Sequence, residues 1–333
     1  MSGFSRICGL VFATAICLAL LAQPAGAALM VDEKLPAYKA TSGVSGNVKS
    51  VGSDTLNNLM TLWAEGFRRS YPDVKIEIEG KGSSTAPPAL IAGTSNFGPM
   101  SRAMKSKEVD AFEKRFGYKP GRIRVGVDAL AIFTNKDNPL KCLSLAQVDA
   151  IFSKTRKGGM KSDVSTWSQV GLKGVWASKP ISVYGRNSAS GTYGYFKKVA
   201  LYKGDFKDSV KEQPGSSAVV QGVASDKFAI GYSGIGYKTA DVIALPVSKK
   251  IGAKCYGPEA KNAYSGNYPI ARFLYIYVNK NPNQALDPLR AQFVKYIFSK
   301  EGQQAVIKAG FFPVNAAIAK QDLGALGMAL GSN

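Results

Sequence analysis

Three short segments of the chain combine glycine with small hydroxyl side chains. They are Gly52-Ser53-Asp54-Thr55, Gly80 to Thr85, and Gly185 to Thr192, which also carries Arg186. Each follows a predicted strand and precedes a predicted helix, where the first backbone amides lack a helical partner and the helix dipole is positive. Amides, hydroxyls and a planar guanidinium are the donors that tetrahedral oxyanions require. The pattern therefore predicts an oxyanion site assembled from three loops.

Helix capping is the simpler explanation of any single segment, because serine and threonine cap ordinary helices. Three segments of the same composition are harder to explain in this way. In one of them Arg186 stands four residues before Ser190-Gly191-Thr192. The combination favours one shared ligand site.

Enzyme motifs that use the same residue types do not fit. A P-loop ending at Gly80 and Lys81 would need glycine at position 75, where the chain has Lys75. Ser190 lacks the leading glycine of a nucleophile elbow. The chain has no histidine, which excludes Ser-His-Asp triads, Cys-His pairs and histidine-bound metals. A Ser-Lys dyad using Ser190 stays open on composition alone, but we expect no enzyme, no cofactor and no metal.

Hydrophobic patterning predicts the elements that would carry these loops. Val74, Ile76 and Ile78 alternate with charged residues as in a strand, whereas the apolar residues from Leu56 to Phe67 have helical spacing. Strands are also expected near 48–51, 181–184, 230–232 and 270–278, and helices after 85, over 144–152, after 190, and over 286–298 and 300–309. Strands alternating with helices are typical of an α/β fold.

The N-terminal segment has the composition of a secretory signal peptide. Arg6 is its only charged residue, a mostly apolar run extends from Ile7 to Ala22, and small residues lead up to Ala27. The run is short for a membrane anchor, and Pro24 ends it. We expect residues 1–27 to be removed near Ala27 and the mature protein to be periplasmic or secreted.

The charge of the chain is strongly basic but dispersed. The 333 residues include Lys+Arg 43 and Asp+Glu 23, a net charge of +20; without Arg6 the 42 cations leave +19. No basic arm or nucleic-acid module is recognisable, so we expect no nucleic-acid partner. The charge fits a solvated surface, a field that concentrates small anions, or an adhesive role on an anionic polymer.

Two cysteines remain after the predicted signal peptide. Cys142 and Cys255 would close a loop of 113 residues if they pair in an oxidising compartment. Two buried free thiols are the alternative. Two cysteines cannot form a structural zinc site.

The three loops resemble the binding loops of PstS-like phosphate-binding proteins, the periplasmic receptors of phosphate ABC transporters. The resemblance runs from about Val48 to Val314, and the Arg-x-x-x-Ser-Gly-Thr element beginning at Arg186 is its most specific part. It implies a two-lobe periplasmic-binding-protein type II fold with the ligand in the cleft between the lobes. The implied divisions are a lead at 28–47, lobe 1 at 48–127 and 271–333, and lobe 2 at 128–270, with hinges near 125–128 and 268–272.

The resemblance also implies the residues that hold the anion. The Thr55 hydroxyl, the Leu56 amide and Ser83 would bind from one lobe, and the Arg186 element from the other. The full set of candidate phosphate-binding residues is Ser53, Asp54, Thr55, Leu56, Ser83, Ser84, Ser101, Arg102, Arg186, Ser190, Gly191 and Thr192.

One position departs from the family pattern. Members of one well-known type have Asp in a Phe-Gly-Ala-Ser-Asp element, whereas this chain has Ser101 there. A carboxylate accepts the proton that phosphate keeps and repels sulfate, but a hydroxyl can also donate to sulfate. Asp54 is a candidate for the missing acceptor, with a plain helix cap as its alternative role, and Arg102 is expected to pair with Asp54 or to contact the anion.

The sequence as a whole predicts a monomeric binding protein for inorganic phosphate that serves the membrane subunits of an ABC transporter. The same fold binding sulfate or another oxyanion, and a secreted scavenging or adhesive protein, are the alternatives.

Overall fold

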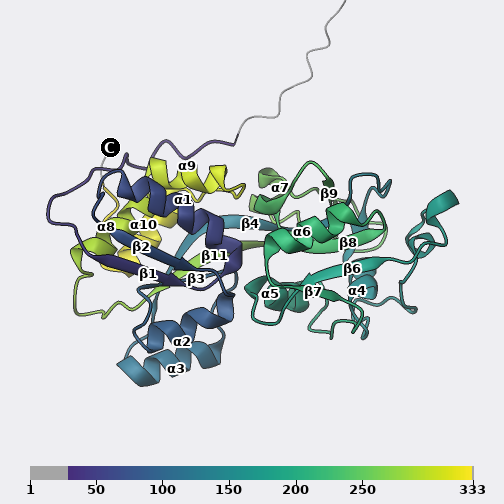
Figure 1. Cartoon of the computed structure of the whole chain (residues 1–333), viewed down its shortest axis with the longest axis horizontal. Helices are drawn as coiled ribbons and strands as arrows, with labels where there is room; N and C mark the ends of the chain where they lie inside the picture. The colour runs from purple at the N-terminus through teal and green to yellow at the C-terminus, as the bar shows by residue number, and fades with distance from the viewer. Residues whose placement is uncertain (1–28, 332–333) are drawn as a thin grey trace, which may run out of the picture.

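The structure is a computed structural model that describes residues 29–331, so the predicted signal peptide lies outside the described residues. Its strands are β1 Asn47–Val51, β2 Lys75–Glu79, β3 Phe97–Met100, β4 Gly121–Asn135, β5 Leu143–Ser144, β6 Ser182–Arg186, β7 Lys211–Gln213, β8 Ala229–Gly234, β9 Val242–Leu245, β10 Val247–Ser248 and β11 Ala271–Val278. The main sheet has the order β2-β1-β3-β11-β4-β8-β6-β7, with β9 also paired to β4. Figure 1 shows helices gathered around both ends of this sheet.

The half of the molecule around β1, β2 and β3 is called lobe 1 below. Its helices are α1 Asn57–Arg68, α2 Ala86–Ile91, α3 Ser106–Phe116, α8 Pro288–Ile297, α9 Lys300–Lys308 and α10 Ala316–Ala325. Helix α1 buries Leu59, Trp63 and Phe67 on one face, as their spacing predicts. The Trp63 indole N–H donates to the carbonyl of Gly302 at 2.8 Å, which ties α1 to α9.

The half around β6, β7 and β8 is called lobe 2. Its helices are α4 Leu145–Phe152, α5 Gly191–Val199, α6 Ser216–Ser225 and α7 Ala260–Tyr264. The predicted capping box at the start of α4 is confirmed: the Ser144 hydroxyl accepts from the Gln147 amide at 3.2 Å, and the Gln147 side chain accepts from the Ser144 amide at 2.9 Å. Cys142 and Cys255 form a disulfide next to the paired strands β5 and β10.

Strand β4 connects the two lobes. Its first part, through Ala129, pairs with β11, and its second part, from Leu130, pairs with β8. The main core of lobe 1 takes residues from 35–125 and 274–326, while the main core of lobe 2 takes residues from 127–270 together with Phe312. We propose that the lobes divide along β4 and just before β11, where the two cores change.

The described part of the N-terminal lead is attached to lobe 1. Leu35 is fully buried in the core of that lobe. The carbonyl of Pro36 accepts from the amide of Lys300 at 2.9 Å, and the Asp32 carboxylate accepts from the amide of Ala316 at 2.9 Å. The lead therefore packs over the starts of α9 and α10.

Candidate anion-binding site

The three loops come together where lobe 1 faces lobe 2. The hydroxyls of Thr55 and Thr192, from the first and third loops, are 2.8 Å apart. The amide of Ser84, in the second loop, donates to the carbonyl of Ala189 in the third at 3.1 Å. These contacts join residues more than a hundred positions apart, so the fold assembles the predicted site from both lobes.

The first loop turns tightly between β1 and α1. A single 3₁₀ turn at Asp54–Leu56 precedes the helix. The amide of Ser53 donates to the carbonyl of Pro99 at 2.8 Å, and the amide of Leu56 donates to the carbonyl of Ser53 at 3.2 Å. The Leu56 side chain packs in the core of lobe 1. This packing fixes the loop and leaves the Thr55 hydroxyl directed toward lobe 2.

The second loop and the end of β3 contribute a pair of serines. The Ser101 amide donates to the Ser83 hydroxyl at 3.0 Å, and the two hydroxyl oxygens are 3.3 Å apart. Both side chains are buried. Gly191 lies against them: a Cβ at that position would be 2.2 Å from Ser83 Oγ and 2.6 Å from Ser101 Oγ. The absence of a side chain at Gly191 is therefore what lets the lobes meet here.

The third loop is organised by a helix cap. The Ser190 hydroxyl accepts from the amides of Thr192 and Tyr193 at 3.1 and 3.4 Å, at the start of α5. Ser190 is thus the N-cap of α5, as its residue type favours. The cap holds Thr192 in the interior, where it is fully buried.

Arg186 ends β6 with its guanidinium buried in the site. The side chain is 1% exposed and 3.1 Å from the Asp54 carboxylate. It also donates to the Ser216 hydroxyl at 2.6 Å and to the carbonyl of Pro214 at 3.1 Å. Its Nε is buried and has no hydrogen-bond partner among the described residues. Burial lowers the pKa of Arg186 and the Asp54 carboxylate opposes that shift, but an arginine remains charged in a protein.

Asp54 connects the lobes. Its Oδ2 accepts from the amide of Ser216 at 2.8 Å as well as pairing with Arg186. The carboxylate therefore reaches the first amide of α6 in lobe 2, from the helical turn Asp54–Leu56 of lobe 1. Tyr237, in lobe 2, donates through its hydroxyl to the carbonyls of Asp54 and Thr55 at 2.9 and 3.2 Å.

Arg102 does not pair with Asp54, which corrects that expectation. Its guanidinium makes two bonds of 2.7 Å to the two carboxylate oxygens of Glu108 on α3. One of its nitrogens also donates to the Ser84 hydroxyl at 3.3 Å. The reason is local: Glu108 is six residues away and supplies a matched bidentate partner. Arg102 thus supports the second loop from its own lobe.

Sequence reasoning missed a second buried ion pair. Arg272 on β11 pairs with Asp128 on β4 at 2.8 Å, with side-chain exposures of 2% and 0%. Arg272 also donates to the Thr192 hydroxyl at 2.8 Å. The available signal was a charge of each sign inside two strongly apolar segments, since such charges are rarely buried without a partner.

Each of the three arginines at and around the three loops is paired with a carboxylate. Arg186 faces Asp54, Arg272 faces Asp128, and Arg102 faces Glu108. Such a site would hold an anion by directed hydrogen bonds and not by an excess of positive charge.

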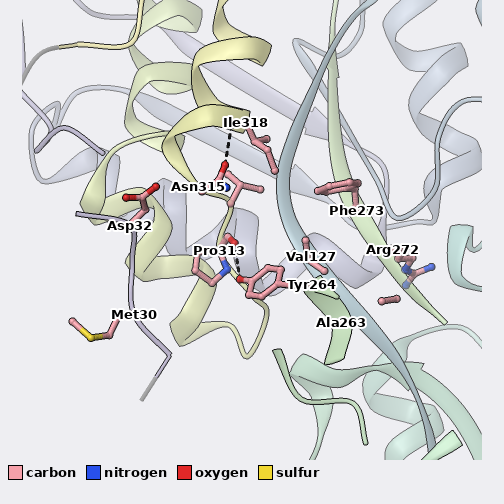
Figure 2. A pocket seen from close by; sticks show the side chains of 12 residues that line it. Met30, Asp32, Val127, Ala263, Tyr264, Arg272, Phe273, Pro313, Asn315 and Ile318 are labelled. Carbon is pink, nitrogen blue, oxygen red and sulfur yellow. Dashed lines mark hydrogen bonds between the residues drawn. The ribbon is translucent and has the colours of Figure 1, made fainter. Parts of the chain in front are cut away.

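A cavity of about 570 Å³ lies beside the paired strands β4 and β11 (Figure 2). Its walls are mostly apolar and include Val127, Tyr264, Phe273 and Ile318. No residue of the three loops lines it, although Arg272, which donates to the Thr192 hydroxyl, is part of its wall. Within residues 29–331, no group of three or more His, Cys, Asp and Glu side chains could hold a metal ion. No helix in the same range is long and apolar enough to cross a membrane.

Comparisons with known proteins agree with this architecture. The model of the PBP superfamily domain matches residues 37–301. "Phosphate-binding protein PstS" of Pseudomonas aeruginosa is 58% identical over 304 residues, covering 91% of this chain and 94% of the relative. The protein of the same name from Staphylococcus epidermidis is 28% identical over 265 residues, covering 79% of this chain and 77% of the relative.

A solved structure with bound phosphate is also similar. It is that of a Clostridium perfringens protein described as a phosphate ABC transporter substrate-binding protein, with a TM-score of 0.68 and 26% identity. The match covers 81% of this chain and all of the other. The family match and the Pseudomonas relative each span most of the sequence. The chain therefore belongs to the PBP superfamily and, within it, to the PstS family of phosphate-binding proteins.

Proposed function

We propose that this protein binds inorganic phosphate between its lobes and delivers it to the membrane subunits of an ABC transporter. The observation that carries the proposal is the free Nε donor of Arg186, buried on a guanidinium that contacts the Asp54 carboxylate of lobe 1 and the Ser216 hydroxyl of lobe 2. A buried charged donor without a partner is costly, and an oxyanion would satisfy it. Both relatives are named phosphate-binding proteins, so phosphate is the first anion to test.

The chemistry is binding without bond cleavage. Thr55, Ser83, Ser101 and Thr192 offer hydroxyl donors, and Arg186 offers the guanidinium. Closure of the lobes would bury the anion and create the surface that a transporter recognises. The protein would act as a monomer in the periplasm or outside the cell.

Calorimetric titration of the mature chain with phosphate tests the proposal. Wild type should bind phosphate, and Arg186→Ala should lose at least about a hundredfold in affinity, since a buried charge-assisted contact is removed. The thermal midpoint should show that the variant is folded. Wild-type affinity in Arg186→Ala, or no phosphate binding by wild type, would remove the basis of the proposal.

Sulfate is the second candidate ligand, because Ser101 is a hydroxyl and a hydroxyl can donate to a fully deprotonated anion. A competition titration separates the two. Phosphate binding that is undisturbed by excess sulfate eliminates this candidate, while displacement at equal concentrations supports it.

A further inference from the structure

Arg272 lies next to the anion site at the start of β11, beside the strand β4 that connects the two lobes. Its partner in the β-ladder is Asp128 of β4. The Nε and Nη2 atoms donate to Asp128 Oδ2 at 3.1 and 2.8 Å. The other carboxylate oxygen accepts from the amide of Ile235 at 3.0 Å. The guanidinium is therefore held in one orientation by a carboxylate that is itself fixed by the backbone of lobe 2.

The same Nη2 donates to Thr192 Oγ1 at 2.8 Å. A guanidinium can only donate, so the Thr192 oxygen is the acceptor in this bond. The hydrogen of the Thr192 hydroxyl must then point elsewhere. The Thr55 and Thr192 hydroxyl oxygens are 2.8 Å apart and either can be the donor, so the Thr192 hydrogen is free to point to Thr55 or to an anion held between the two loops. Arg272 thus occupies one acceptor position of the Thr192 hydroxyl and restricts the directions in which that hydroxyl can donate.

A second observation links Arg272 to a ligand. Its Nη1 is buried and has no hydrogen-bond partner among residues 29–331, as is also true of Arg186 Nε. Unsatisfied buried donors on charged groups are rare and costly. The two unsatisfied donors here are on Arg186, which pairs with Asp54 of the first loop, and on Arg272, which donates to Thr192 of the third loop.

We propose that Arg272 is a positioning residue of the phosphate site, acting through the Thr192 hydroxyl. The inference rests on the proposed function. It adds Arg272, a residue of strand β11, to a site otherwise built from the three loops. It predicts that phosphate affinity depends on Arg272 only while Thr192 keeps its hydroxyl. A role limited to neutralising Asp128 would affect folding but would show no such dependence.

A double-mutant cycle tests this dependence by phosphate calorimetry on the mature chain. Arg272→Met should weaken binding about 10- to 100-fold, and Thr192→Val should weaken it as well. In the double variant, Arg272→Met should add less than about twofold to the loss caused by Thr192→Val, because the shared bond is already gone. Fully additive losses, or unchanged affinity in Arg272→Met, would overturn the proposal.

Arg124→Met is the matched control. Arg124 lies on β4, the strand paired with β11, and like Arg272 it pairs with an aspartate, Asp322 at 2.6 Å; its hydrogen bonds go to Gln321 and Asp322 and not to the three loops. This variant should lower the thermal midpoint and leave the phosphate affinity within about twofold of wild type. An equal loss of affinity in Arg124→Met would mean that any lost ion pair weakens binding, and the proposal would fail.

Arg272→Met leaves Asp128 buried without its partner, so this variant can fail to fold. The double substitution Asp128→Asn with Arg272→Gln removes both charges, and it should fold and still bind phosphate at least tenfold more weakly. Wild-type affinity in that variant would overturn the inference alone. Absence of phosphate binding by wild type would instead overturn the proposed function on which it rests.

Discussion

Asp54 has two roles at the level of a single residue, because its carboxylate contacts both a cation and a helix start. Its Oδ2 pairs with the Arg186 guanidinium and accepts a hydrogen bond from the Ser216 amide. Its Oδ1 accepts no hydrogen bond from residues 29–331. This oxygen belongs to the carboxylate that pairs with Arg186, and it could accept the proton of monohydrogen phosphate, a role that the Ser101 hydroxyl cannot perform as a carboxylate would.

Asp54→Asn should therefore change selectivity as well as affinity. We expect phosphate affinity to fall by about tenfold or more and sulfate to begin to compete, because the amide no longer repels a fully deprotonated anion. The measurement is the ratio of the phosphate and sulfate dissociation constants. Ser216→Ala is the control, since it removes a partner of Arg186 but keeps the carboxylate. An unchanged ratio in Asp54→Asn would restrict Asp54 to joining the lobes.

The stabilising effect of the Arg102–Glu108 ion pair depends on pH through the Glu108 carboxylate. Burial raises the pKa of Glu108, but hydrogen bonds from Arg102 and the Lys105 amide lower it more, so it lies below its ordinary value of 4.5. The folded pKa is depressed. The ion pair therefore stabilises fully above about pH 4.5 and loses its contribution as the pH falls through the folded pKa.

Glu108→Gln should accordingly lower the free energy of unfolding by about 1–3 kcal/mol at pH 7. Denaturant titrations of wild type and variant should converge as the pH is lowered below 4.5, where wild-type Glu108 becomes protonated. The exposed Asp110 on the same helix supplies the control Asp110→Asn, which should be close to neutral. A difference in the free energy of unfolding that stays the same at low pH would show that the charge of the Glu108 carboxylate does not stabilise the fold.

At the scale of elements, the start of α5 is shaped by contact with lobe 1. Gly191 stands where any Cβ would overlap the hydroxyls of Ser83 and Ser101. A larger residue must keep the lobes apart or displace the serines. The glycine of the Ser-Gly-Thr element is thus explained by close approach and not by backbone conformation.

Gly191→Ala should impair closure while leaving each lobe folded. We expect at least about a tenfold loss of phosphate affinity, since overpacking of a tight contact costs about 1–3 kcal/mol. Small-angle scattering should show no compaction of this variant on adding phosphate. Gly194→Ala on the same helix is matched, because its Cβ would lie 3.6 Å from Arg102 Cδ, an ordinary contact. Equal affinity in both variants would contradict the steric explanation.

The elements that the sequence predicted well are those with a strong local pattern. The apolar face of α1, the capping box of α4 and the three loops follow from residues close together in the chain. Helix α6 was not predicted, although Asp54 contacts its first amide from 162 positions away. The Arg272–Asp128 pair also depends on the pairing of β4 with β11, across 144 positions. Such partners are set by topology, which local spacing does not encode.

At the scale of the whole molecule, the overall charge and the charge of the site differ. After loss of Arg6 the chain carries +19, with 42 basic and 23 acidic residues, whereas the ion pairs around the three loops are balanced. A dispersed positive field acts on an anion while it approaches from solvent. Once the lobes close, the anion is shielded from that field by the protein and held by short hydrogen bonds.

Salt should therefore act on the association rate. Between about 0.01 M and 0.15 M sodium chloride the screening length falls from about 30 Å to about 8 Å, which removes most long-range attraction. Stopped-flow measurements should show phosphate association slowing several-fold while dissociation changes by less than about twofold. Replacing the exposed Lys249 and Lys250 by Glu lowers the net charge by four and should slow association at low salt only. A dissociation rate that rises with salt would instead mean that net positive charge holds the bound anion, contrary to the balanced pairs in the structure.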